Sequence, residues 1–122
     1  MSVPVWLGVG LAGALGALAR FHVAARVTAR RATDFPLGTF LVNISGAFVL
    51  GLLTGLAVTT DTLAIAGTGF LGGYTTFSTW MVESQRLGED GEWLFVWVYL
   101  FGSLAAGVPS AALGWLLGAA LG

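Results

Sequence analysis

The sequence contains no cysteine and a single histidine, and only 9% of its 122 residues are charged. Without cysteine the chain can form neither a disulfide nor a thiolate metal site, and one histidine argues against a transition-metal enzyme. The formal net charge of -1 provides no basic field, so nucleic acid is not expected as a partner. The scarcity of charge also excludes an ordinary soluble domain.

Apolar residues dominate what is present: they make up 57% of the chain, and the mean hydropathy is +0.89. This composition predicts an all-α integral membrane protein, and the length leaves room for one bundle. A helix of about 20 residues crosses the hydrocarbon layer. We therefore expect a single transmembrane domain, 1–122, with four helices at about 4–25, 36–58, 62–85 and 93–121 and both chain ends on the same side.

The third apolar segment contains a stretch that is unsuited to an inert membrane helix. Gly69, Gly72 and Gly73 are followed by four hydroxyl residues within five positions, namely Thr75, Thr76, Ser78 and Thr79. Backbone at membrane depth must satisfy its own hydrogen bonds, unless protein buries it or it lines a polar cavity or an ion site. We therefore predict a helix that is broken near its middle, which commonly marks the functional centre of a membrane protein.

Small residues recur at every fourth position in two of the expected helices. The first helix has Gly8, Ala12 and Gly16, and the fourth has Gly102, Ala106, Ser110, Gly114 and Gly118. Such stripes let helices approach closely. Because four short helices enclose little space for a water-filled path, we expect an oligomer in which these stripes form the seams between chains.

Five polar side chains inside or at the ends of the apolar segments allow two readings each. Asn43 is either a hydrogen-bonding link between helices or a ligand. Arg20, expected at the end of the first helix, either reaches the headgroups or attracts an anion, and Glu83 is either an interfacial carboxylate or handles ions. Tyr99 is either an interface aromatic or, with Ser103 one turn later, part of a polar track.

The apolar segments offer no acid–base pair, no nucleophile with a base and no metal cluster, so we do not expect an enzyme or an organic cofactor. They do offer neutral donors: Thr39, Asn43, Ser45, Thr75, Thr76, Ser78, Thr79, Tyr99, Ser103 and Ser110. Neutral donors without a buried cation suit brief contact with an anion, because conduction requires sites that an ion can leave.

Three stretches, residues 13–21, 38–48 and 69–80, together closely resemble the Fluc (CrcB) family of small bacterial and archaeal fluoride channels. The resemblance covers nearly the whole chain. It implies an antiparallel, dual-topology dimer with two fluoride pathways in the prokaryotic plasma (inner) membrane. It also implies fluoride resistance by passive export: fluoride enters as neutral HF, dissociates inside and leaves as the anion through the channel.

The resemblance also implies residue roles. Asn43 would donate to fluoride, and Phe77 would present a ring edge to it; Trp80 stands where the family has a second phenylalanine, which is a departure. The other pathway residues that the resemblance implies are Arg20, Thr76, Thr79, Glu83, Tyr99 and Ser103, although the next expected hydroxyl position is Gly107. Backbone carbonyls of Gly72 and Thr75 would bind a structural sodium ion at the dimer centre.

The arginines outside the apolar cores lie on one side of the expected bundle: Arg26, Arg30, Arg31 and Arg86. The positive-inside rule would hold that side in the cytoplasm, which sits badly with dual topology. We expect a homodimer, with a heterodimer of oppositely oriented homologues as the alternative. Two other functions stay open: a small multidrug-type proton-coupled exporter, although residues 4–25 lack the carboxylate it needs, and a non-transporting membrane assembly subunit.

Overall fold

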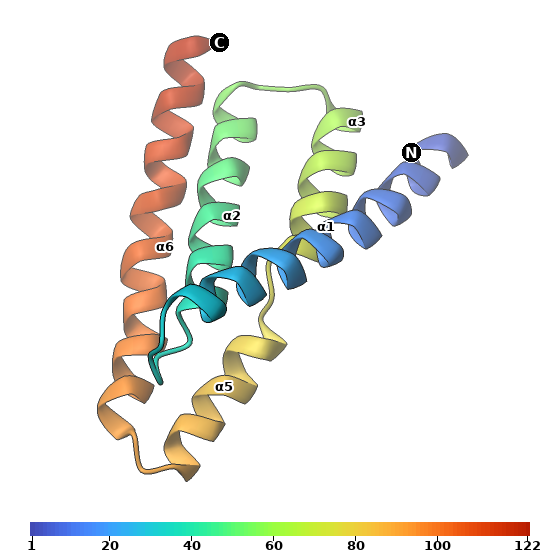
Figure 1. Cartoon of the computed structure of the whole chain (residues 1–122). Coiled ribbons are helices and arrows are strands. Elements are labelled where there is room, and N and C mark those ends of the chain that lie inside the picture. Colours follow the sequence, from blue (N-terminus) through green and yellow to red (C-terminus); the bar gives the residue numbers. More distant parts are fainter.

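The computed structural model describes all 122 residues, and its regular structure is entirely helical (Figure 1). The four long helices are α1 (Val3–Arg30), α2 (Leu37–Gly55), α5 (Ser78–Glu89) and α6 (Trp93–Leu121). Between α2 and α5 the chain forms three consecutive helical pieces: α3 (Thr60–Thr62), the π-helix η1 (Leu63–Leu71) and α4 (Gly72–Tyr74). Both chain ends and the α2–α3 connection lie toward one end of the molecule. The α1–α2 and α5–α6 connections lie toward the opposite end (Figure 1).

Helix α1 begins where Ser2 caps it, because the Ser2 hydroxyl accepts a hydrogen bond from the Val5 N–H at 3.4 Å. It ends at Arg30, five residues later than the sequence predicted. Arg20 therefore lies well inside the helix, and the expectation that it ends the helix is wrong. Arg26 also belongs to α1 and not to the following loop.

Helices α2 and α6 run parallel, side by side, and their glycines bring the two backbones into contact (Figure 1). A Cβ atom at Gly51 would collide with the carbonyl of Ala111, and one at Gly114 would collide with the carbonyl of Phe48. Gly114 belongs to the small-residue stripe of the fourth helix, and it packs against α2 of the same chain. The prediction that this stripe forms a seam between chains is therefore wrong at this position. The small-residue stripe of the first helix also packs within the chain at Gly16, where a Cβ atom would collide with the Phe70 carbonyl.

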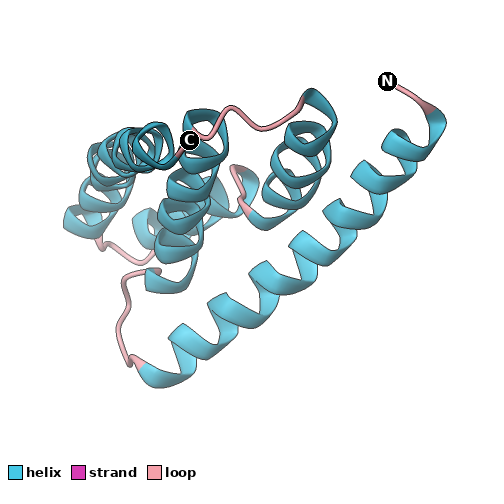
Figure 2. Ribbon diagram, turned by 90° about the horizontal axis from the view of Figure 1, so that it is seen from above, coloured by secondary structure: helices cyan, strands magenta, loops and turns pink.

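The third apolar segment is not one helix. Helical geometry stops at Tyr74, Thr75 has extended backbone angles (φ -81°, ψ 162°), and α5 starts at Ser78. The π-helix η1 precedes this interruption, and π-helical turns are frequent at functional sites. Helix α1, which starts at the end marked N, lies along one side of the molecule (Figure 2), and it packs against η1 and α4 of this segment.

Three helices, α1, α2 and α6, are long and apolar enough to cross a membrane. Only 16 of the 122 residues are buried, and the exposed surface carries many large apolar side chains. An outer surface of this kind suits lipid and not water, so the chain is a multi-pass membrane protein. The interrupted segment contains no single helix of that length.

Candidate functional site

Asn43 connects α2 to the interruption of the third segment. Its Nδ2 atom donates to the Thr76 carbonyl at 2.9 Å, and its Oδ1 atom accepts from the Thr76 N–H at 2.8 Å. This pairing replaces the bonds that the Thr76 backbone would make in a continuous helix. The structure thus gives Asn43 the linking role, while the second N–H of Nδ2 stays free to donate.

The Thr76 side chain also stabilises the first turn of helix α5, which begins at Ser78. The Thr79 N–H donates to the Thr76 hydroxyl oxygen at 3.2 Å, and the Thr76 hydroxyl lies 3.2 Å from the Thr79 hydroxyl. A threonine hydroxyl in this position satisfies an N–H that the first turn of a helix leaves without a partner. The Thr76 backbone is therefore hydrogen-bonded to Asn43 of α2, and the Thr76 hydroxyl is hydrogen-bonded to the first turn of α5.

Among the backbone carbonyls that lose their helical donors at the interruption are those of Gly72 and Thr75. In a continuous helix the Gly72 carbonyl would accept from Thr76, whose N–H instead binds Asn43. The Thr75 carbonyl would accept from Thr79, whose N–H instead binds the Thr76 hydroxyl. The interruption thus presents carbonyl oxygens at the negative end of a helical segment.

Arg20 lies beside these carbonyls. Its Nε atom donates to the Gly73 carbonyl at 3.2 Å, which replaces the bond that residue 77 would give in a continuous helix. The arginine is thereby held against the third segment and does not extend along α1 toward the headgroups. Sequence reasoning missed Gly73 as its partner, because no local pattern relates residues 53 positions apart.

A cavity of about 650 Å³, here called the vestibule, opens between α1, the start of α2 and α5. Its polar lining comprises Arg20, Thr28, Thr39, Thr76, Thr79 and Glu83. The sequence-predicted residues Arg20, Thr76, Thr79 and Glu83 are therefore brought together here. Thr28 was missed, although it lies eight residues, about two turns, after Arg20 on the same face of α1.

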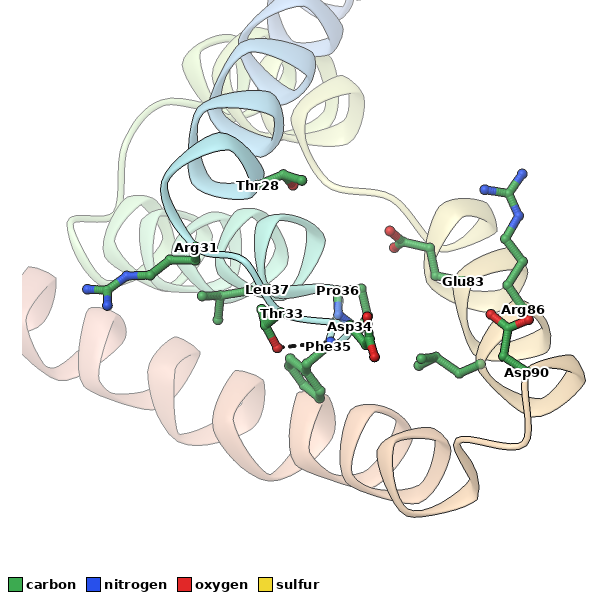
Figure 3. Close-up of a pocket in the computed structure, with 11 residues that line it drawn as sticks. Thr28, Arg31, Thr33, Asp34, Phe35, Pro36, Leu37, Glu83, Arg86 and Asp90 are labelled. Atoms are coloured by element: carbon green, nitrogen blue, oxygen red, sulfur yellow. Dashed lines mark hydrogen bonds between the residues drawn. The ribbon is translucent and has the colours of Figure 1, made fainter.

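A second, smaller pocket of about 230 Å³ adjoins the vestibule at the end that carries the α1–α2 and α5–α6 connections (Figure 3). Thr28, Pro36 and Glu83 line both cavities. Thr28 and Glu83 point toward the space between α1 and α5, whereas Arg31 points away from it (Figure 3). Glu83 therefore lies where this end pocket meets the vestibule.

A third cavity of about 340 Å³, here called the inner cavity, lies on the other side of Thr76. It is lined by Asn43, Gly46, Ala47, Leu50, Thr75, Thr76, Phe77 and Trp80. The Phe77 and Trp80 rings meet edge to face, with centroids 5.8 Å apart at 80°. Because Thr76 lines both the vestibule and the inner cavity, the three cavities follow one another along α5.

Tyr99 and Ser103 of α6 lie behind these cavities and line none of the three. The fully buried Tyr99 donates its hydroxyl to Glu83 Oε1 at 2.9 Å, and its carbonyl accepts from Trp80 Nε1 at 3.4 Å. The Ser103 hydroxyl is buried without a hydrogen-bond partner. Tyr99 of α6 thus makes two hydrogen bonds to α5, one through its hydroxyl and one through its backbone carbonyl.

Residues 7–115 match the model of a protein family described as CrcB-like protein, Camphor Resistance (CrcB). A protein of Mycobacterium bovis named fluoride-specific ion channel FluC 2 is 48% identical over 114 residues, which cover 93% of this chain and 90% of the relative. The chain belongs to the CrcB family.

Two further CrcB-family relatives match across almost their whole length. Fluoride-specific ion channel FluC 2 of Moorella thermoacetica is 45% identical over 120 residues, covering 95% of this chain and 98% of the relative. Fluoride-specific ion channel FluC 1 of Geobacillus kaustophilus is 42% identical over 118 residues, covering 97% and 99%. The family resemblance seen in the sequence is confirmed. Because these relatives are named as ion channels, the chain is not an enzyme.

Proposed function

We propose that the chain is a fluoride-selective passive ion channel that exports fluoride from the cytoplasm across the prokaryotic inner membrane. The observation that carries the proposal is the inner cavity, where the free N–H of Asn43 and the rings of Phe77 and Trp80 surround one space. The names of the CrcB relatives supply the identity of the ion. Fluoride would move down its own gradient, without coupling to proton movement or to ATP hydrolysis.

In this account the anion first enters the vestibule, where Arg20 is the cationic side chain of the lining. It then passes Thr76 into the inner cavity, whose lining contains no charged residue. There an amide N–H and the electropositive edges of aromatic rings replace part of its water shell. Neutral contacts are favourable enough for entry and weak enough for release.

The functional unit in this proposal is an antiparallel dimer, with the interrupted third segment as the fourth crossing of each chain. Two features support a partner: Phe77 is 69% exposed in the single chain, and the inner cavity is open on one side. A second copy in the opposite orientation would cover both. The arginines at the end that carries the α1–α2 and α5–α6 connections favour one orientation, so a heterodimer with an oppositely oriented homologue is the alternative to the homodimer.

A structural sodium ion at the dimer centre is part of the same proposal. The Gly72 and Thr75 carbonyls fit this ion, because both lack their helical donors and both are hard oxygen ligands. Gly72 is also exposed, and nothing in its own chain lies closer than 4.0 Å to where its Cβ would be. The ion would coordinate these carbonyl oxygens and hold two chains together.

Reconstitution into liposomes tests the proposed function. Vesicles loaded with potassium fluoride are diluted into fluoride-free buffer, and efflux is followed with a fluoride electrode after valinomycin is added. We expect rapid fluoride efflux without a proton gradient, and no chloride efflux, followed with a chloride electrode, from vesicles loaded with potassium chloride. Proton flux that depends on a drug would instead indicate a multidrug-type exporter, and no flux at all would indicate an assembly subunit.

A further inference from the structure

One face of helix α1 changes from apolar to basic along its length. Six exposed residues follow one another on this face at spacings of three or four positions, and we call them the outer strip: Leu11, Leu15, Leu18, His22, Arg26 and Arg30. Such spacings keep side chains on one side of an α-helix. The three leucines are 60–70% exposed, and the basic residues continue their row toward the end of the helix.

The outer strip faces away from the vestibule and from the inner cavity. The α1 residues that line the vestibule include Arg20, Ala24 and Thr28. At about 100° per residue, their face of the helix lies roughly opposite that of Arg26. No residue of α1 lines the inner cavity, whose open side the proposed partner would cover. Because α1 lies along one side of the molecule (Figure 2), the outer strip is left to the surrounding lipid.

The length of α1 brings the basic part of the outer strip to the level of the lipid headgroups. The helix has 28 residues, which span about 42 Å, whereas the hydrocarbon layer is about 30 Å thick. From one boundary of this layer, about 20 residues bring the helix to the other boundary near His22. A tilt of the helix moves this point toward Arg30, and the long arginine side chains then reach the headgroups.

The arginines of the outer strip have no partner within the protein. Helix α1 contains no acidic residue, and Arg20 is the one arginine of the chain whose side chain is hydrogen-bonded to another residue. Arg26 and Arg30 therefore keep their guanidinium donors free. A guanidinium group binds a phosphate through two parallel hydrogen bonds. A phospholipid with net negative charge matches the whole strip, because its acyl chains suit the leucines and its phosphate suits the arginines.

We propose that the outer strip of α1 binds an anionic phospholipid, with the phosphate on Arg26 and Arg30 and an acyl chain along the leucines. The bound lipid would hold the last turns of α1 in place. Thr28 on the other face of these turns lines both the vestibule and the end pocket, so the lipid would support the wall of both cavities. The inference does not depend on which ion the protein carries.

Thermal unfolding of the purified protein in detergent micelles tests this site. Dioleoylphosphatidylglycerol is titrated into the micelles. Dioleoylphosphatidylcholine, which has the same chains and no net charge, and inorganic phosphate, which has no chains, are titrated in parallel. We expect phosphatidylglycerol to raise the unfolding midpoint and the other two probes to leave it unchanged, because a ligand stabilises the state that binds it.

Three results of this titration would overturn the inference and leave the proposed function intact. If phosphatidylcholine stabilises equally, the strip is an apolar surface without headgroup recognition. If inorganic phosphate stabilises equally, the arginines bind a free anion and not a lipid. If phosphatidylglycerol causes no shift, the strip binds neither part.

Paired arginine variants locate the effect on the outer strip. The double variant Arg26→Gln, Arg30→Gln should need about 30-fold more phosphatidylglycerol for the half-maximal shift, the factor for two arginines at about 1 kcal/mol each. The matched control Arg31→Gln, Arg86→Gln removes the same charge at the same end of the molecule but outside the strip, and should need at most about threefold more, because salt screens distant charges. Arg26→Lys with Arg30→Lys keeps the charge and should retain most of the affinity, which separates lost binding from misfolding. Equal losses in the two glutamine variants would replace the site by a general attraction between charges and overturn the inference.

Discussion

Replacing Asn43 with aspartate changes one atom at the point where α2 holds the interrupted segment. The variant keeps an acceptor for the Thr76 N–H, which lies 2.8 Å from Oδ1. It loses the bond from Nδ2 to the Thr76 carbonyl and places a second carboxylate oxygen against that carbonyl. The lost bond costs about 1 kcal/mol, and the unsatisfied carbonyl adds about 1–3 kcal/mol.

The effect on conduction should be larger, because the carboxylate adds a negative charge to the lining of the inner cavity. A fluoride ion about 5 Å from this charge is repelled by about 3 kcal/mol at an effective dielectric constant of about 20. That energy corresponds to a loss of about 100-fold in efflux rate. Fluoride-electrode recordings from liposomes measure it directly.

Gln85→Glu is the matched control, because it makes the same amide-to-carboxylate change on α5 outside the vestibule and the inner cavity. We expect its efflux to stay within twofold of wild type. Efflux from the Asn43→Asp channel at the rate of this control would refute the placement of Asn43 in the pathway. Size-exclusion chromatography of both variants separates blocked conduction from failure to assemble.

Three further substitutions test other parts of the account. Phe77→Ile should reduce fluoride efflux at least tenfold without lowering stability, since the ring is 69% exposed in its own chain, whereas Phe101→Ile, at an exposed ring of α6, should not. Gly72→Leu has open space within its chain, so a loss of dimer on size-exclusion chromatography, absent from the equally open Gly102→Leu, would indicate the intermolecular sodium site; an intact dimer would count against it. Arg20→Gln removes a charged donor from a helical carbonyl and should lower stability by about 1 kcal/mol, and an unchanged denaturation midpoint would contradict that capping role.

The helical class and the position of the interruption follow from short-range patterns in the sequence. Glycines followed by hydroxyl residues weaken a helix locally, and Thr75 departs from helical geometry where this pattern predicts it. The family resemblance implied that Arg20, Thr76, Thr79 and Glu83 are pathway residues. The four side chains line one vestibule, and their role in a pathway stays a prediction.

What the sequence could not provide are the partners of these residues, because those contacts join positions far apart in the chain. The bond from Asn43 to Thr76 spans 33 residues, and the packing of Gly51 on Ala111 spans 60. A stripe of small residues predicts a close neighbour without telling whether that neighbour belongs to the same chain. The predicted end of α1 was too early, because the arginines after residue 25 were interpreted as a polar loop. In the structure they continue the helix to Arg30.

The reversal potential of the channel in a planar bilayer tests the central claim most directly. With equal chloride and pH on both sides and a tenfold fluoride gradient, we predict a reversal potential of about 59 mV, the Nernst value for one charge. A reversal potential that stays at zero under the fluoride gradient, or that follows an imposed chloride or proton gradient, would contradict a pathway built from Asn43, Phe77 and Trp80 to carry fluoride alone.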